Sequence, residues 1–425
     1  MTVRRRLTMA SLRPLRHRDF AIVWTAALVS NVGSWMQIIA TGVLITELTG
    51  RASWTGLVAA AGFLPIGVLS PIGGAVADRV NRKRWLLITT FGETVFATLM
   101  AVATGTGHVS PGVLTLLVFG AGSMLALGIP AFQAILPDLV GRDEILAATS
   151  LSLAEYNLGR VVGPALTGVV LALGSYTWAY AINAVSYGAV LIALVLIRLP
   201  GPVPTDEQGG VWARIVTGVR AAAADSGCRL AISAIAVTAL LISPFIALVP
   251  AVAVKLFDNG PTGTSVLITA QGAGAVIGAL LLAPLAKRSG RRRLLVGNLV
   301  VLPLVVVGYA LAPSLAVATV ALLLLGMTYV GVLSGLGTVV QLRAPASLRA
   351  RVLSLYMVAL GVIYPIGAVI QGWVGDRFGL RTVTAGTAAV FLAVVLLSRV
   401  ARPGLAAGFD DVVTAPAEAE GVAPA

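Results

Sequence analysis

The chain has 425 residues, of which 58% are hydrophobic and only 11% are charged. Soluble domains carry about 25% charged residues, so this composition excludes an ordinary soluble protein and indicates a multi-pass membrane protein. The net charge of +13 is better explained by Lys and Arg retained on the cytoplasmic side of a membrane than by nucleic-acid binding. One cysteine and two histidines exclude an internal disulfide and argue against a metal centre, and no cofactor is expected.

Apolar stretches separated by short polar breaks predict twelve membrane-spanning helices, each long enough to cross about 30 Å of hydrocarbon. A basic arm, residues 1–19, precedes them. It resembles the start of a signal peptide, but the apolar run after it is too long for one, so we expect an uncleaved first helix. The predicted spans are 20–46, 53–77, 85–105, 112–137, 145–172, 177–198, 230–254, 264–286, 294–312, 315–341, 352–374 and 382–400.

A hydrophilic linker at 201–228 divides the spans into an N-terminal bundle, 20–200, and a C-terminal bundle, 229–402. One helical face within the linker is apolar, which predicts a short amphipathic helix at the membrane surface; a plain disordered linker is the alternative. That face comprises Trp212, Ile215, Val216, Val219 and Ala223. The Ala/Pro-rich, acidic segment 403–425 is predicted to be a disordered tail.

The distribution of Lys and Arg predicts how the spans are oriented in the membrane. An even number of spans places both termini on one side, and nearly all Lys and Arg then fall on that side. Arg160 lies within a span, and four basic residues lie on the other side: Arg51, Lys255, Arg377 and Arg381. The positive-inside rule therefore predicts cytoplasmic termini and a location in the inner (plasma) membrane.

The sequences of the two halves are weakly similar to each other. Segment 77–87 aligns without gaps to 286–296, and 151–159 is similar to 353–361. Chance similarity between Ala/Leu-rich segments is the alternative. Duplication predicts two pseudo-symmetric bundles with a pathway between them.

The segment GGAVADRVNRKRW, 73–85, resembles the signature loop between helices 2 and 3 of the major facilitator superfamily. The residues that carry this resemblance are Gly74, Asp78, Arg79, Arg82 and Lys83. Span 5 is similar to the Gly-x-x-x-Gly-Pro motif of that superfamily's drug-export antiporters, although Thr167 stands where a glycine is common. The motif residues there are Gly159, Gly163, Pro164 and Gly168. The resemblance covers about residues 15–402 and is strongest toward the macrolide-efflux and enterobactin-exporter subgroup.

This resemblance implies an all-α membrane fold of two six-helix bundles that work by alternating access. It also implies that Asp78 and Arg79 hold the outward-open state by contacting the other half. Arg288 and Arg291 occupy the matching loop of the second half, where Lys287 replaces the aspartate. A simple positive-inside anchor is the alternative for these charges. The span 5 motif is implied to lie between the halves, and ordinary small-residue packing is its alternative.

Ionisable residues inside a span cost roughly 3 kcal/mol or more, so they are candidates for substrate or proton sites. This chain has Glu93 in span 3 and Glu155 and Arg160 in span 5; structural pairing with neighbouring helices is the alternative. Many proton-coupled members of the superfamily carry an Arg in helix 4, and span 4 has none. Coupling, if it exists, must therefore use Glu155 or Glu93, or follow a different mechanism.

Polar uncharged residues add further candidates. One face of span 1 forms a polar stripe, which should face a cavity because lipid offers it no partner. The stripe consists of Asn31, Ser34, Gln37 and Thr41, and later spans contribute Gln133 and Gln271. Each of the later residues could equally hydrogen-bond between helices.

The sequence thus predicts a secondary transporter that exports a small amphipathic molecule, such as a drug or siderophore, by proton antiport. A metabolite importer of the same fold and a non-transporting sensor or scaffold are the alternatives. No nucleophile–base set, HExxH pair or phosphate loop is present, so an enzyme is not expected. The expected partners are the substrate, the proton gradient and the lipid bilayer, without nucleic acid, and family habit suggests a monomer.

Overall fold

The structure, a computed structural model, describes residues 12–199, 211–345, 348–401 and 404–410. Helices make up nearly all of these residues, and none of them lies in a β-strand. This is the expected outcome for apolar segments in lipid, where each backbone N–H and C=O must be satisfied within its own segment. The start of the predicted basic arm, linker residues 200–210 and the predicted tail beyond residue 410 lie outside the described residues.

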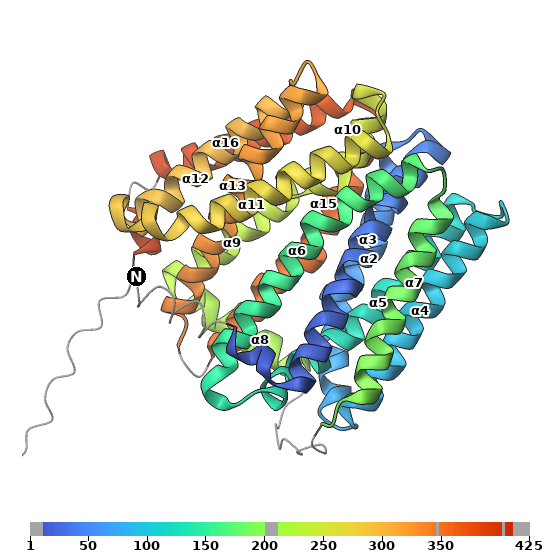
Figure 1. The fold of residues 1–425 in the computed structure, drawn as a ribbon. Coiled ribbons are helices and arrows are strands. Elements are labelled where there is room, and N and C mark those ends of the chain that lie inside the picture. The colour runs from blue at the N-terminus through green and yellow to red at the C-terminus, as the bar shows by residue number, and fades with distance from the viewer. Residues whose placement is uncertain (1–11, 200–210, 346–347, 402–403, 411–425) are drawn as a thin grey trace, which may run out of the picture.

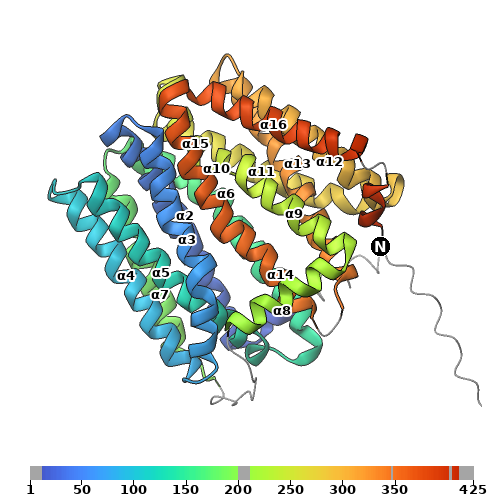
Figure 2. The same ribbon diagram turned by 180° about the vertical axis from the view of Figure 1, so that it is seen from behind.

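The helices form two bundles, which lie side by side in Figures 1 and 2. The first bundle contains α2 (Arg18–Thr49), α3 (Ala52–Ala77), α4 (Arg82–Gly105), α5 (Pro111–Ile135), α6 (Ile145–Ala172) and α7 (Tyr176–Leu196). The second contains α9 (Ser226–Leu241), α10 (Pro244–Phe257), α11 (Pro261–Ser289), α12 (Arg291–Ala310), α13 (Leu315–Arg343), α14 (Arg349–Val358), α15 (Tyr364–Phe378) and α16 (Leu380–Ala401). Helices α2, α3 and α6 face α10, α11 and α15 across the boundary.

The described helices cross the molecule twelve times, because α9 with α10, and α14 with α15, each make one interrupted crossing. Eleven crossings within the described chain are long and apolar enough to span a membrane. The twelfth is α6, whose middle is less apolar because it carries Glu155, Asn157 and Arg160. The predicted fold class, an all-helical membrane protein of two six-helix bundles, is confirmed.

Both interrupted crossings lie in the second bundle. Pro244 has no N–H to donate to the carbonyl of Leu240, so the helix breaks between α9 and α10. The buried Gln371 of α15 donates from Nε2 to the carbonyls of Leu240 and Leu241, both at 3.0 Å. These bonds replace the backbone hydrogen bonds that the carbonyls at the end of α9 lose at the break. The other crossing contains a five-residue π-helical segment, Ala359–Ile363, between α14 and α15. Such segments are common at functional sites.

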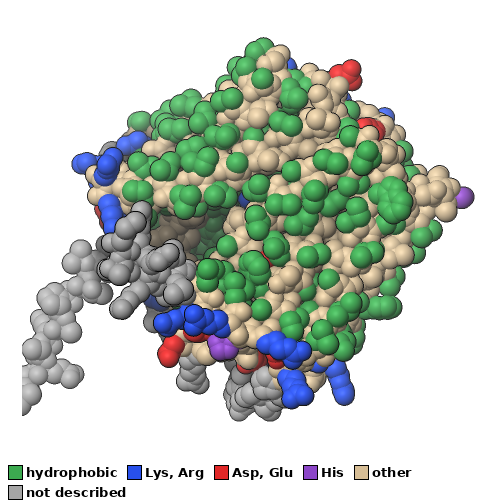
Figure 3. All heavy atoms as spheres, viewed as in Figure 1, with side chains coloured by type: hydrophobic (Ala, Val, Ile, Leu, Met, Phe, Trp, Pro, Cys, Tyr) green, Lys and Arg blue, Asp and Glu red, His purple; other side chains and the backbone are tan. Residues whose placement is uncertain are grey.

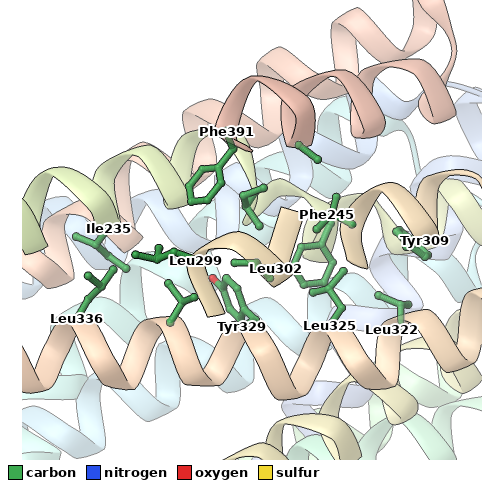
Figure 4. Packing of buried hydrophobic residues seen from close by; sticks show 14 of the residues in the cluster. Ile235, Phe245, Leu299, Leu302, Tyr309, Leu322, Leu325, Tyr329, Leu336 and Phe391 are labelled. Carbon is green, nitrogen blue, oxygen red and sulfur yellow. The ribbon is translucent and has the colours of Figure 1, made fainter. Parts of the chain in front are cut away.

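A large apolar core fixes the second bundle. Figure 4 shows side chains from several helices meeting there, including Phe245, Tyr329 and Phe391. The rings of Phe245 and Tyr329 meet edge to face, with centroids 5.6 Å apart. The Tyr329 hydroxyl lies 2.8 Å from Ser243 Oγ at the break between α9 and α10. This packing places Phe245 at the boundary between the bundles.

The linker contains helix α8 (Val211–Ala224), which packs against α14. Its Gly218 faces the backbone of Arg351 closely enough that a side chain there would clash. Of the predicted apolar face, Val216, Val219 and Ala223 are exposed, and the side chains of Trp212 and Ile215 lie outside the described residues.

The tail differs from expectation over its first residues. Disorder was predicted from 403, but Leu405–Phe409 form a 3-10 turn and Phe409 is only 9% exposed. Asp410 Oδ2 pairs with Arg292 at 2.6 Å, and the Asp410 carbonyl accepts from Arg343. Arg343 also binds Asp225 through Nε and Nη2, at 2.9 and 2.8 Å, which lowers the pKa of Asp225 to about 2. An aromatic anchor and ion pairs therefore order this segment.

Basic side chains gather at one end of the molecule, as the blue atoms at the left and lower edges of Figure 3 show. We call this end the basic face. It includes Arg82, Lys83 and Arg84 in the first turn of α4, and Lys287, Arg288, Arg291, Arg292 and Arg293 around the turn between α11 and α12. The other end, where Arg51, His108, Lys255 and Asp376 lie, is called the opposite face.

Candidate functional site

A cavity of about 110 Å³ lies between the two bundles. Its walls come from α2, α3, α5, α6, α10, α11 and α15. Most of its lining is apolar, with aromatic surface from Trp35, Phe63, Phe245 and Tyr364. The polar side chains that line it are Gln37, Thr41, Thr55, Arg160 and Gln271. An apolar cavity with a few fixed polar groups is the usual form of a small-molecule binding site.

Arg160 and Gln271 meet across the boundary inside this cavity. Arg160 Nη2, from α6, donates to Gln271 Oε1, from α11, at 2.5 Å. The guanidinium lies over the ring of Trp35, with its carbon 5.5 Å from the ring centroid. One hydrogen bond thus joins the two bundles at the middle of the membrane-spanning region.

Glu155 has a different partner from Arg160. Its carboxylate accepts a hydrogen bond from Asn31 Nδ2 of α2, within the same bundle, and the residue is only 3% exposed. The two ionisable residues of α6 are five positions apart, about 140° around the helix, and no ion pair joins them. Glu155 is therefore held by one neutral amide, whereas Arg160 reaches into the cavity.

The polar stripe of α2 is divided between two environments. Three of its residues bond to α7: Ser34 Oγ lies 3.1 Å from the Tyr187 hydroxyl, Thr41 Oγ1 lies 3.1 Å from the Tyr180 hydroxyl, and Gln37 Oε1 accepts from Asn183 at 2.8 Å. Gln37 and Thr41 also line the cavity, and Asn31 holds Glu155.

Glu93 and Gln133 do not line the cavity. Glu93 is buried in α4, which packs on α5 and α7 at the outer side of the first bundle. Gln133 is exposed near the end of α5. The structure therefore does not bring these two candidates together with Arg160, Gln271 and Glu155.

The glycine motif of α6 packs mostly within its own bundle. A Cβ added to Gly159 would lie 2.8 Å from Asn31 Cβ, and one added to Gly163 would lie 2.6 Å from Trp35 Cβ, both on α2. Only Gly168 faces the second bundle, where Ser265 lies at ordinary contact distance. Pro164 follows Gly163 inside the helix. The motif therefore allows α6 to pack closely on α2, and this packing places Glu155 beside Asn31.

We expect Gly163→Ala to lower the free energy of unfolding by about 1–3 kcal/mol, because the new methyl group overlaps Trp35. Thermal unfolding of the purified protein in detergent measures this. Gly188→Ala in α7 is the control, since nothing lies within 4 Å of the added Cβ and the gain in helix propensity is the same. Equal unfolding temperatures for the two variants would contradict the packing argument.

The charged cluster after α3 makes its contacts within the first bundle. Arg82 Nη1 lies 3.5 Å from Asp138 Oδ2, and Lys83 Nζ donates to the carbonyls of Val195 and Ile197 at 3.0 and 2.8 Å. Among the described residues, no side-chain hydrogen bond or ion pair involves Asp78 or Arg79. Gly74 contacts Pro130 of α5 loosely, and Arg288 and Arg291 are exposed at the matching turn.

Asp376 is a cross-bundle contact that the sequence reasoning missed. It lies near the end of α15 on the opposite face, and its oxygens accept from the N–H groups of Ala52 and Ser53 at 2.7 and 3.0 Å. Those N–H groups open α3 and have no partner within that helix. Lys255 Nζ adds an ion pair to Asp376 at 3.2 Å.

A sequence signal for Asp376 exists. The pattern Gly-x-Val-x-Asp-Arg occurs at 74–79, at the end of α3, and again at 372–377, at the end of α15. The same motif thus ends two facing helices, once at the basic face and once at the opposite face. Among the described residues, only the second copy forms a side-chain hydrogen bond to the other bundle.

Small residues bring the bundles together from the opposite face inward. A Cβ at Gly372 would lie 2.6 Å from the Ala52 carbonyl, and one at Gly42 would lie 2.6 Å from Pro250 Cγ. Close approach continues along α3 as far as Gly67, which meets Gly361 of the π-helical segment. Toward the basic face the surface is hollowed between the bundles (Figure 3). The opposite face is therefore the closed one.

Comparison with known proteins agrees with this architecture. The family described as transmembrane secretion effector matches residues 9–414. The multidrug efflux pump Tap of Mycolicibacterium fortuitum is 28% identical over 373 residues, which cover 85% of this chain and 90% of Tap. The enterobactin exporter EntS of Salmonella paratyphi A is 28% identical over 370 residues, covering 84% and 86%.

Solved structures show the same fold at lower identity. A bacterial homologue of the human lysosomal transporter Spinster aligns with a TM-score of 0.71 and 15% identity, over 93% of this chain and 98% of that one. The nucleoside transporter NupG aligns with a TM-score of 0.72 and 14% identity, over 92% and 99%.

Proposed function

We propose a function from one established premise: the chain belongs to the transmembrane secretion effector family of the major facilitator superfamily, and is a multi-pass membrane transporter. The proposed function is export of a small amphipathic molecule, such as a drug or a siderophore, by proton antiport. The observation that carries it is the cavity between the bundles, which combines aromatic walls with Arg160 and Gln271. The two exporters named above support the direction of transport.

The basic face is proposed to be cytoplasmic, with both termini there and the chain in the inner membrane as a monomer. The clustering of Lys and Arg at that face supports this orientation. The structure then corresponds to a state closed toward the exterior, in which Asp376 seals the outer end of α3. A transporter needs at least one further state, open to the exterior, to complete its cycle.

The charged loop after α3 is proposed to seal the cytoplasmic side in that other state. Asp78 and Arg79 are unengaged here, as expected for a contact that forms only when the basic face closes. Arg82 and Lys83 would hold the loop to its own bundle, and Arg288 and Arg291 would flank it from the other half.

The test is export from cells that lack their own multidrug exporters. Expression of the chain should raise the inhibitory concentrations of several amphipathic drugs several-fold and lower their cellular accumulation. Addition of a protonophore should restore accumulation, because no ATP-binding motif is present in the sequence. Faster uptake on expression would indicate import, and efflux that persists after the protonophore would overturn proton antiport.

A further inference from the structure

We infer that the transported molecule carries an anionic, oxygen-rich group that binds Arg160 and Gln271, attached to an apolar body that packs on the aromatic wall of the cavity. This inference rests on the proposed function and narrows its substrate class.

The first step is a surplus of hydrogen-bond donors. Arg160 Nη2 uses the Gln271 carbonyl oxygen, but Arg160 Nε is buried without a partner, and so is Gln271 Nε2. Buried donors without acceptors are unfavourable, so native structures rarely keep them unless something else supplies the acceptor. Both residues line the cavity, and a bound molecule is therefore the natural source.

The second step is an unbalanced charge. Across the described residues, no carboxylate lies within 4 Å of the Arg160 guanidinium, and no Asp or Glu lines the cavity. Glu155, on the same helix, points to Asn31 instead. Trp35 holds the guanidinium by a cation–π contact but leaves its charge in place. A cation in a low-dielectric site favours an anionic ligand and disfavours a cationic one.

The third step is the arrangement of the remaining polar groups. Gln37 Oε1 accepts from Asn183, and Thr41 Oγ1 lies within hydrogen-bonding distance of Tyr180, both on α7. The buried donors without a partner in the cavity lining are Arg160 Nε and Gln271 Nε2. Around them lie Phe63 and Tyr364, whose rings meet edge to face with centroids 5.5 Å apart, and Phe245. The cavity therefore offers one binding region for the polar head group of a ligand and another for its apolar body.

The two donors come from different bundles, Arg160 from α6 and Gln271 from α11. A ligand group that accepts from both would bridge the bundles. Its binding would then depend on their relative position, which is what coupling of binding to alternating access requires.

Three dansyl compounds that share one fluorophore test the inference: dansylglycine (anionic), dansylamide (neutral) and dansylethylenediamine (cationic). Binding to the purified protein in nanodiscs is measured by energy transfer from tryptophan to dansyl. We expect dansylglycine to bind the wild type about tenfold more tightly than either other compound. Gln271→Glu is expected to abolish this preference, because it places a carboxylate beside Arg160 with no change of shape.

Arg160→Gln should remove the preference as well, and Arg160→Lys should keep part of it. Arg399→Gln is the matched control, since Arg399 is exposed at the end of α16 and the charge change is the same. Equal or cation-selective binding by the wild type, undetectable binding of dansylglycine, or a preference that survives Gln271→Glu would overturn the inference.

Transport of the same three compounds is measured separately in proteoliposomes. Transport of the neutral or cationic compound without anion preference would overturn the substrate class and leave the transport proposal intact. Arg160-dependent binding of dansylglycine with no movement of any compound would support the binding inference and count against the proposed function.

Discussion

Glu155→Gln is expected to abolish proton-driven export while the protein still folds and binds its substrate. The carboxylate is buried between α6 and α2 and accepts a hydrogen bond from Asn31 Nδ2. A glutamine carbonyl can accept the same bond, so the packing is preserved and only the exchangeable proton is lost. A carboxyl group held by one neutral amide can keep or release its proton as the surroundings change, which is the property that a proton carrier needs.

Proteoliposomes separate the two halves of this prediction. Efflux driven by an imposed pH gradient should disappear in Glu155→Gln, whereas exchange of labelled for unlabelled substrate, which needs no net proton movement, should continue. Glu144→Gln is the control, because Glu144 is a carboxylate at the basic face that pairs with His17 at 2.8 Å outside the cavity. Loss of driven efflux in Glu93→Gln but not in Glu155→Gln would place the proton site in α4 instead.

The fold could be predicted from the sequence because the bilayer imposes a simple rule. Each span needs about 20 mostly apolar residues in helical conformation, so the polar breaks show where each span ends. Caps confirm those breaks locally: Ser110, Ser175 and Ser314 each accept a backbone N–H from the first turn of the following helix. The break at Pro244 could have been read in the same way. Its partner Gln371 could not, because it comes from a helix more than 120 positions away.

The candidate site was only partly accessible to sequence reasoning. The cost of polar groups in lipid singled out Arg160, Gln271 and Glu155, but their partners depend on how helices rotate against one another. The bond between Arg160 and Gln271 joins two bundles, and the bond between Asn31 and Glu155 joins two helices with no pattern in common. Asp376 was overlooked because the internal comparison aligned equivalent helices of the two halves, whereas α3 and α15 are not equivalent.

Asp376→Asn is expected to weaken closure of the opposite face. Both carboxylate oxygens accept backbone N–H groups that begin α3, and Lys255 Nζ pairs with Oδ1. Asparagine keeps one acceptor oxygen but turns its NH₂ group toward the second N–H, so one bond is lost and a donor faces a donor. Charge-assisted bonds of this kind contribute about 1.5–3 kcal/mol, which corresponds to a tenfold or greater shift toward the state open at that face.

Distances between spin labels on the opposite face measure this shift. Labels are attached to His108→Cys in the first bundle and Pro313→Cys in the second, with Cys228→Ser to remove the native thiol. In Asp376→Asn the distance distribution should gain a longer population. Asp258→Asn, the same change at the exposed end of α10, has no cross-bundle partner and a left-handed backbone that asparagine tolerates, so it should match the wild type.

Asp78→Asn completes the argument, because it alters the other copy of the Gly-x-Val-x-Asp-Arg motif. Asp78 makes no side-chain hydrogen bond or ion pair to the second bundle within the described residues, and it lies at the other end of α3, so removing its charge should not open the opposite face. If Asp78 seals the basic face in the alternate state, Asp78→Asn should reduce any long-distance population and slow transport while expression persists. A longer distance in Asp78→Asn, or an unchanged one in Asp376→Asn, would show that the two copies do not act at opposite ends of one equilibrium.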